Sequence, residues 1–206
     1  MPGTGETYLH GHHDSVLRSH RWRTAENSAG YLLPRLQDAD RVLDVGCGPG
    51  TITVDLAARV PQGEVVGIDA AGDVLEDARQ EASRQGRPNV RFDTGDVYHL
   101  AFNDAAFDVV HTHQVLQHLG DPVAALAEMR RVCRPGGLVA ARDSSSAAQP
   151  PFAGPALARL CRSADLGMTS DLETASREPG RTFGAMSAFP GPARSLLGFT
   201  GLWAPP

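Results

Sequence analysis

The sequence lacks long apolar runs, paired cysteines and a secretion signal. No apolar run approaches the roughly 18 residues that a membrane-spanning helix needs, so we expect no membrane partner. The 3 cysteines are odd in number and widely spaced, which favours neither a disulfide framework nor a zinc motif. The N-terminus has neither the basic start nor the apolar stretch of a signal peptide, so we expect a soluble, cytoplasmic protein.

The sequence also lacks an excess of positive charge. Its 19 Lys and Arg residues against 24 Asp and Glu residues give a formal net charge of −5. Nucleic-acid affinity depends largely on Lys and Arg that neutralise phosphates, so this balance opposes a nucleic-acid partner. We interpret the local basic residues Arg18, Arg21 and Arg23 as a solvated helix face.

The chain divides into three segments by pattern. Residues 1–40 predict an N-terminal helical cap or lid. Residues 41–143 alternate apolar, strand-like runs with segments of helical spacing, which predicts a Rossmann-like α/β fold: a doubly wound, mostly parallel sheet with helices on both faces. Residues 144–206 are interrupted by Ser, Gly and Pro, and predict a divergent, partly irregular C-terminal segment.

Five strands and a well-marked helix are expected in the middle segment. The helix begins at Asp121, with Pro122 at its first position, and runs to about Cys133. The strands are short apolar runs, expected at 41–45, 64–68, 89–92, 107–111 and 138–141.

The strongest chemical signal follows the first expected strand. The motif Asp44-Val45-Gly46-Cys47-Gly48-Pro49-Gly50-Thr51 lies between a strand and a helix, where open α/β sheets bind ligands. Asp69 ends the second strand, where a carboxylate can accept both hydroxyls of a ribose. The dinucleotide fingerprint expects its third glycine where Thr51 stands, which counts against NAD.

A second signal follows the third expected strand. In Phe92-Asp93-Thr94-Gly95-Asp96-Val97, Asp96 can accept a hydrogen bond from an adenine amino group while Val97 covers the ring. Together with the glycine motif and Asp69, these residues describe an adenosine pocket.

At these motifs the sequence resembles the class I S-adenosylmethionine-dependent methyltransferases, particularly the small-molecule branch that includes ubiquinone/menaquinone-biosynthesis-type enzymes. The resemblance covers roughly residues 8–143. It rests on five ordered motifs, at 42–50, 67–69, 95–97, 107–110 and 131–137.

The resemblance implies S-adenosyl-L-methionine as the cofactor and S-adenosyl-L-homocysteine as the product. It places the methionyl part on the glycine loop, the ribose at Asp69, and the adenine at Asp96 and Val97. His113 and Gln114 would face the methionyl end. The expected cofactor-binding residues are Asp44, Gly46, Cys47, Gly48, Gly50, Asp69, Ala70, Asp96, Val97, His113 and Gln114.

Asp44 would help to bind the methionyl ammonium group, directly or through water. Methyl transfer is an in-line displacement, so the enzyme mainly aligns and desolvates the reactants. An acceptor hydroxyl or acidic carbon would benefit from a base, for which His118 is the first candidate, His113 the second and His111 a third.

No metal is expected. The cluster His10-Gly11-His12-His13 has no carboxylate or cysteine partner at ligand spacing, and we interpret it as part of a polar lid. In proteins that this chain resembles, the region before the first strand closes over the cofactor. That closure would bring Tyr8, His12 or His20 near the substrate.

A small organic methyl acceptor is the preferred substrate. DNA and RNA amino-methyltransferases often carry an Asn/Asp-Pro-Pro-aromatic motif after the fourth strand, where this chain has His113-Gln114-Val115-Leu116. Two alternatives stay open: a non-catalytic cofactor-binding or protein-interaction relative, and a nicotinamide-dependent oxidoreductase.

The C-terminal segment departs from the resemblance. Family members usually continue after the fifth strand with a helix and an antiparallel strand pair. Here only the run 195–200 suggests a further strand, and the last strand has no evident sequence. We therefore expect an incomplete strand pair and an exposed edge on the fifth strand, which a homodimer would cover.

Overall fold

The structure is a computed structural model that describes residues 23–144, 184–187 and 193–200. The expectations about the beginning of the cap and about most of the C-terminal segment lie outside this part of the chain. The side chains concerned include Tyr8, His10, His12, His13, Arg18, His20 and Arg21.

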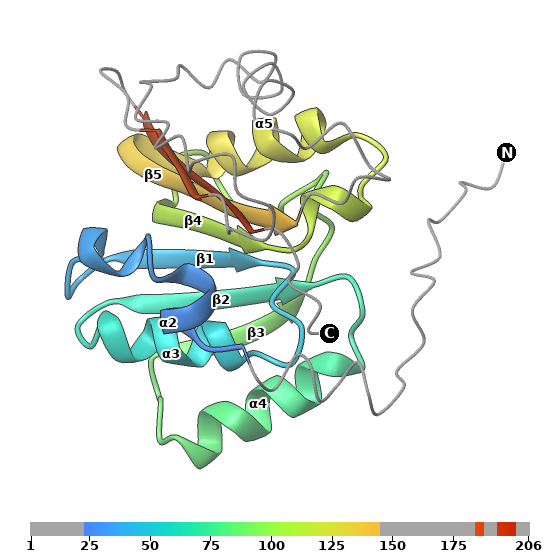
Figure 1. The fold of residues 1–206 in the computed structure, drawn as a ribbon. Helices are drawn as coiled ribbons and strands as arrows, with labels where there is room; N and C mark the ends of the chain where they lie inside the picture. Colours follow the sequence, from blue (N-terminus) through green and yellow to red (C-terminus); the bar gives the residue numbers. More distant parts are fainter. Residues whose placement is uncertain (1–22, 145–183, 188–192, 201–206) are drawn as a thin grey trace, which may run out of the picture.

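A seven-stranded sheet forms the centre of the described chain, in the order β3-β2-β1-β4-β5-β7-β6. Strands β1 to β5 run parallel (Figure 1), which confirms the predicted doubly wound α/β architecture. The chain returns to the centre between β3 and β4, so β1 and β4 are neighbours at the switch point of the sheet. The strands are β1 (Arg41–Val45), β2 (Glu64–Asp69), β3 (Val90–Thr94), β4 (Phe107–His113), β5 (Cys133–Ser144), β6 (Gly184–Ser187) and β7 (Ala193–Thr200).

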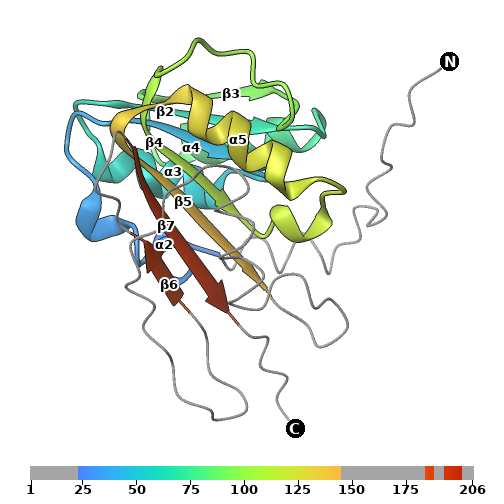
Figure 2. The same cartoon turned by 90° about the horizontal axis from the view of Figure 1, so that it is seen from above.

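The structure corrects the expectation of an incomplete C-terminal strand pair. β7 pairs with β5 in parallel from Gly137 to Ser144, and β6 pairs with β7 in antiparallel fashion at the sheet edge (Figure 2). The run 195–200 is part of β7, the last strand that the structure describes. The missed strand is β6, whose four residues Gly-Ala-Met-Ser carry little apolar pattern. The edge of β5 is therefore paired, and it no longer argues for a homodimer.

Helices cover both faces of the sheet (Figure 1). On one face, α2 and α3 pack through Ala25 and Leu56 in the same apolar cluster as Val42. On the other face, α5 packs through Leu126 in the same cluster as Leu43. Adjacent residues of β1 thus serve opposite faces, as the alternation of side chains along a strand requires. The helices and 3-10 turns are α2 (Ala25–Ala29), η1 (Leu33–Arg35), α3 (Thr51–Arg59), α4 (Val74–Arg84), η2 (Leu116–His118) and α5 (Pro122–Val132).

The start of α5 agrees with the sequence prediction. The Asp121 side chain accepts a hydrogen bond from the N–H of Ala124 at 3.0 Å, and Pro122 occupies the first turn. Such a cap satisfies an N–H that the helix itself leaves unpaired. The end of α5 differs, because β5 already begins at Cys133 rather than after Gly137.

Candidate functional site

The glycine loop joins β1 to α3 and lies over the end of β2. Gly46, Gly48 and Gly50 all have positive φ, at 72°, 53° and 77°. The N–H groups of Gly46 and Cys47 donate to the carbonyl of Ile68 at 2.8 and 3.0 Å. The left-handed conformations favour glycine because a Cβ atom would clash with the backbone.

The glycine loop also touches the loop that follows β4. A Cβ atom placed on Gly46 would lie 2.3 Å from Cγ2 of Val115. The first glycine of the motif therefore serves a close approach between two loops as well as a backbone conformation. Both loops lie at the carboxyl edge of the sheet, beside the switch point, where doubly wound folds bind their ligands.

Asp69 links the end of β2 to the glycine loop. Its carboxylate accepts hydrogen bonds from the N–H of Gly48 at 2.8 Å and from the N–H of Ala71 at 2.9 Å. An ionised carboxylate has about four acceptor positions, so about two stay open for further donors. The neighbouring Ala70 is exposed.

Asp96 and Val97 follow β3, as the sequence predicted. The Asp96 carboxylate accepts a hydrogen bond from the N–H of Tyr98 at 2.9 Å and lies 3.3 Å from Nδ1 of His99. Its side chain is 58% exposed, so it can still receive a donor from a ligand. Val97 is partly buried against the core cluster of the α5 face.

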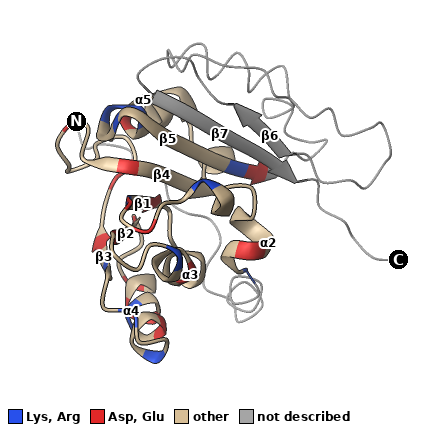
Figure 3. Ribbon diagram, turned by 90° about the vertical axis from the view of Figure 1, so that its left-hand side faces the viewer, with Lys and Arg blue, Asp and Glu red and all other residues tan. Residues whose placement is uncertain are grey.

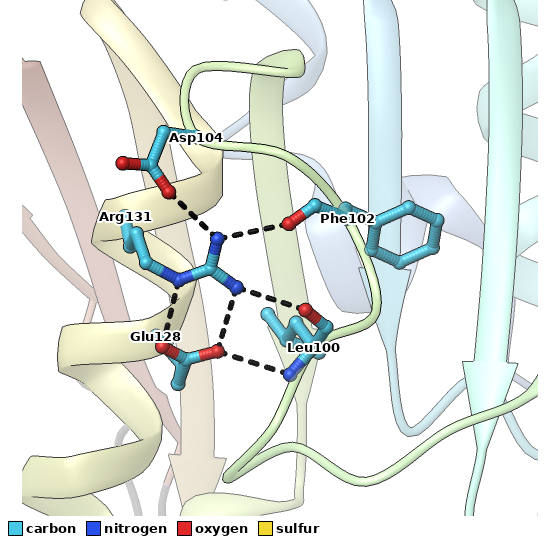
Figure 4. A network of polar contacts seen from close by, with 5 residues as sticks. All are labelled: Leu100, Phe102, Asp104, Glu128 and Arg131. Atoms are coloured by element: carbon cyan, nitrogen blue, oxygen red, sulfur yellow. Dashed lines mark hydrogen bonds and ion pairs between the residues drawn. The ribbon is translucent and has the colours of Figure 1, made fainter.

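The connection from β3 to β4, which carries Asp96, is anchored to α5 by Arg131 (Figure 4). The guanidinium donates to the carbonyl oxygens of Leu100 and Phe102 and to Asp104, each at 2.8 Å. It also donates twice to Glu128, again at 2.8 Å. The planar fork of an arginine suits such a set of acceptors.

The end of β4 and the loop after it carry the predicted residues His113, Gln114 and His118. Gln114 has a φ of 61°, although it is not a glycine, and its N–H donates to the carbonyl of Arg142 at 2.7 Å. The amide of Gln117 joins the loop internally, because its Nε2 lies 2.9 Å from Oε1 of Gln114 and 3.1 Å from Nε2 of His118. His113 is half-buried and His118 is exposed.

Asp143, near the end of β5, binds the backbone of the same loop. It is 1% exposed, and its Oδ1 accepts a hydrogen bond from the N–H of Gln117 at 3.2 Å. Burial raises the pKa of the Asp143 carboxyl to about 7, although the backbone donors of residues 115–117 oppose the shift. Sequence reasoning missed this residue because its partner, Gln117, is 26 residues away in the loop after β4.

Asp44 faces the interior at the switch point. Its Oδ1 lies 2.8 Å from Nδ1 of His111 in the neighbouring strand, and its Oδ2 accepts a hydrogen bond from the Thr53 hydroxyl at 2.6 Å. Asp44 is 2% exposed and His111 is 0% exposed. The sequence marked both residues as candidates but not their pairing.

Cys47, in the glycine loop, is buried among the apolar side chains between α3 and α4. Burial raises the pKa of its thiol far above the ordinary range, so the side chain is a neutral thiol. Within the described residues, no group of three or more His, Cys, Asp or Glu side chains could hold a metal ion. The same part of the chain contains no helix that is long and apolar enough to span a membrane.

Glycines, a strand-end carboxylate and a second acid thus gather at one edge of a doubly wound sheet, as in domains that bind nucleoside cofactors. The family described as "Methyltransferase domain" matches residues 36–182, more than half of the chain. An uncharacterized methyltransferase of Schizosaccharomyces pombe is 44% identical over 144 residues, which cover 66% of this chain and 51% of the relative. A demethylmenaquinone methyltransferase of Deinococcus radiodurans is 41% identical over 97 residues, or 47% of this chain and 40% of that enzyme.

Among solved structures, a methyltransferase from Aquifex aeolicus has the same fold. It superposes with a TM-score of 0.64 and covers 77% of this chain and 90% of its own, at 19% identity. The chain belongs to the class I S-adenosylmethionine-dependent methyltransferases. It spans about half the length of the curated relatives that it matches.

Proposed function

We propose that this chain transfers the methyl group of S-adenosyl-L-methionine to a small organic acceptor. The observation that carries the proposal is the Asp69 carboxylate, which binds the N–H of Gly48 at 2.8 Å and keeps acceptor positions open. One residue thereby couples the proposed ribose site to the loop proposed for the methionyl part. The family membership supports the same cofactor.

The proposed cofactor site follows the carboxyl edge of the sheet. Asp96, exposed after β3, is the proposed acceptor for the adenine amino group, with Val97 beside the ring. The loop after β4 would face the methionyl end through His113 and Gln114. The full proposed set is Asp44, Gly46, Cys47, Gly48, Gly50, Asp69, Ala70, Asp96, Val97, His113 and Gln114.

The cofactor supplies a methyl group already activated by a sulfonium, so the protein's task is to align the acceptor and exclude water. The contacts of the segment before β1 support a cap function, because its described part is hydrogen-bonded to α3 and to β5. The N–H of Ala25 in α2 donates to Asp55 of α3 at 3.0 Å, and Arg142 of β5 donates to the carbonyl of Asn27. We propose that residues 1–40 form this cap and that 41–143 form the cofactor-binding part.

His118 is the first candidate for a proton acceptor, with His113 as the second. The Gln117 amide nitrogen, a donor, lies 3.1 Å from Nε2 of His118, which favours the ring tautomer with its proton on Nδ1. The methyl-accepting substrate would therefore have to displace the Gln117 amide before the substrate could give its proton to Nε2 of His118. A base is needed only if the methylated atom carries a proton that must leave.

A small acceptor agrees with the relatives and with the charge of the chain. The Deinococcus relative is by name a demethylmenaquinone methyltransferase. The formal net charge of −5 opposes a polyanionic substrate. Figure 3 shows both signs of charge on α4, where Glu76 and Asp77 lie in the first turn and Arg84 in the last.

Calorimetric titration of S-adenosylhomocysteine tests the cofactor part of the proposal. We expect the wild type to bind it and Asp69→Ala to bind at least about tenfold more weakly, because hydrogen bonds to charged groups contribute roughly 1.5–3 kcal/mol. NAD is the control ligand and should not bind. Binding of NAD, or equal affinity of the variant, would contradict the assignment.

Methyl transfer to an acceptor panel with labelled cofactor tests the second part. Transfer to a small phenol, quinol, amine or thiol, with none to nucleic acid, is the expected result. A chain that binds S-adenosylhomocysteine and methylates nothing would favour the non-catalytic alternative. The strand pair of β7 and β6 beside β5 weakens that alternative, because the apparent lack of this pair in the sequence had motivated it.

A further inference from the structure

The pair formed by Asp44 and His111 lies at the switch point of the sheet. The two residues are register partners on β1 and β4, the neighbouring strands between which ligands of doubly wound folds bind. Their side chains point to the face covered by α3, from which Thr53 donates its hydroxyl to the second carboxylate oxygen. Two donors from two elements therefore fix one buried carboxylate.

The hydrogen bonds indicate which nitrogen of His111 carries the proton. Nε2 is buried and has no hydrogen-bond partner among the described residues. An ionised carboxylate can only accept hydrogen bonds, so the proton between the two side chains belongs to Nδ1 of His111. His111 is thus a donor to Asp44, 2.8 Å away.

We propose that His111 is a positioning residue of the cofactor site, which holds the Asp44 carboxylate for the methionyl ammonium group. This inference rests on the proposed function, because it requires the methionyl part to lie on the glycine loop, which begins two residues after Asp44. His111 and Thr53 occupy two of the carboxylate's roughly four acceptor positions. The others are left for the ammonium, directly or through water.

Orientation of the carboxylate matters because an ordered group loses less conformational entropy when the ligand arrives. Without the His111 donor, the Asp44 side chain would keep, within the described part of the chain, only its bond to Thr53. The cofactor would then have to order it on binding. The loss should fall on the amino-acid part of the ligand and spare the nucleoside part.

Two ligands separate these parts in a calorimetric titration of the full chain. S-adenosylhomocysteine carries the amino-acid part, and 5′-methylthioadenosine keeps the nucleoside and the sulfur without it. His111→Leu removes the donor at similar side-chain volume. We expect this variant to bind S-adenosylhomocysteine about tenfold more weakly and 5′-methylthioadenosine with unchanged affinity. His111→Asn should restore most of the loss, because its amide N–H can replace Nδ1–H.

Two further variants separate positioning from general damage. Thr53→Val is nearly isosteric and removes the other donor to Asp44. It should also lower the affinity for S-adenosylhomocysteine without changing that for 5′-methylthioadenosine. Thr112→Val is the matched control, since Thr112 is 0% exposed on the same strand. Its hydroxyl donates to the carbonyl of Val45 at 2.9 Å, away from Asp44, so both affinities should stay the same.

The ratio of the two affinities decides the outcome. If His111→Leu and Thr53→Val leave the ratio of the two affinities unchanged, whether both affinities fall or neither does, the positioning role is overturned while the proposed function stands. If His111→Leu does not fold, the ratio measured with Thr53→Val decides alone. If the wild type binds neither ligand, the proposed function fails, and this inference fails with it.

Discussion

The loops after β1 and after β4 touch at Gly46 and Val115, yet their conformations have different origins. The first loop bends through three glycines with positive φ. The second contains a non-glycine residue with positive φ, Gln114, whose N–H bonds to the carbonyl of Arg142. The N–H of Gln117 bonds to Asp143.

The difference shows two ways to build one binding edge. The glycine loop depends on local backbone freedom, so a substitution within it should damage it directly. The loop after β4 depends on acceptors supplied by β5, so its stability should respond to changes in that strand. The following predictions test this contrast, from the largest expected effect to the smallest.

Gly46→Ala should destabilise the protein most. The new Cβ atom would lie 2.3 Å from Cγ2 of Val115 at a φ of 72°, so overpacking and the left-handed penalty add to a loss of about 4 kcal/mol in unfolding free energy. Urea unfolding measures the loss. Gly86→Ala is the control, since Gly86 also has positive φ but nothing lies within 4 Å of its Cβ position. It should lose only about 1 kcal/mol, and equal losses would refute the role of the loop contact.

Asp143→Asn should change how stability depends on pH. The pKa of Asp143 is raised from 3.8 to about 7, so between these values the folded state binds a proton that the unfolded state lacks. The stabilisation by this group is full below its unfolded pKa and is lost as pH rises through about 7.

The wild type should therefore lose about 3 kcal/mol relative to Asp143→Asn between about pH 5 and about pH 8. Thermal or urea unfolding of both proteins at the two pH values gives the difference. Asp108 and Glu128 have lowered pKa values in the fold and stabilise it as pH rises. Their contributions cancel in the difference between wild type and variant. Parallel pH profiles would show that Asp143 is not a buried carboxylate of this kind.

Arg131→Lys tests a third connection, the one from β3 to β4 (Figure 4). Lysine keeps the charge but cannot donate to both carbonyls and both carboxylates in one plane. About 2 kcal/mol of unfolding free energy should be lost, because the carbonyl oxygens of Leu100 and Phe102 each lose the hydrogen bond from the guanidinium. The affinity for S-adenosylhomocysteine should fall as well, since this connection carries Asp96.

Arg84→Lys is the matched control for this change. Arg84 also pairs with a glutamate three residues away, Glu81, but its side chain is 70% exposed. Exposed ion pairs contribute little to stability. Denaturant midpoints should match the wild type, and a loss as large as that of Arg131→Lys would mean that charge geometry alone does not distinguish the two arginines.

Local patterns were sufficient for much of the architecture. Short apolar runs located β1 to β5, since side-chain alternation and turn residues act within a few positions. Asp121 and Pro122 located the start of α5 for the same reason. β6 was missed because its four residues offer neither β-branched side chains nor alternation.

The sequence by itself determined the order of the strands along the chain, the glycine loop, and Asp69 about 20 residues downstream, because all of these depend on short-range backbone preferences and spacing. Only the tertiary structure decided that Asp44 pairs with His111, 67 residues away, and that Asp143 supports the loop after β4. Strand register and burial bring such groups together, and no local pattern encodes which partner a buried polar group will find.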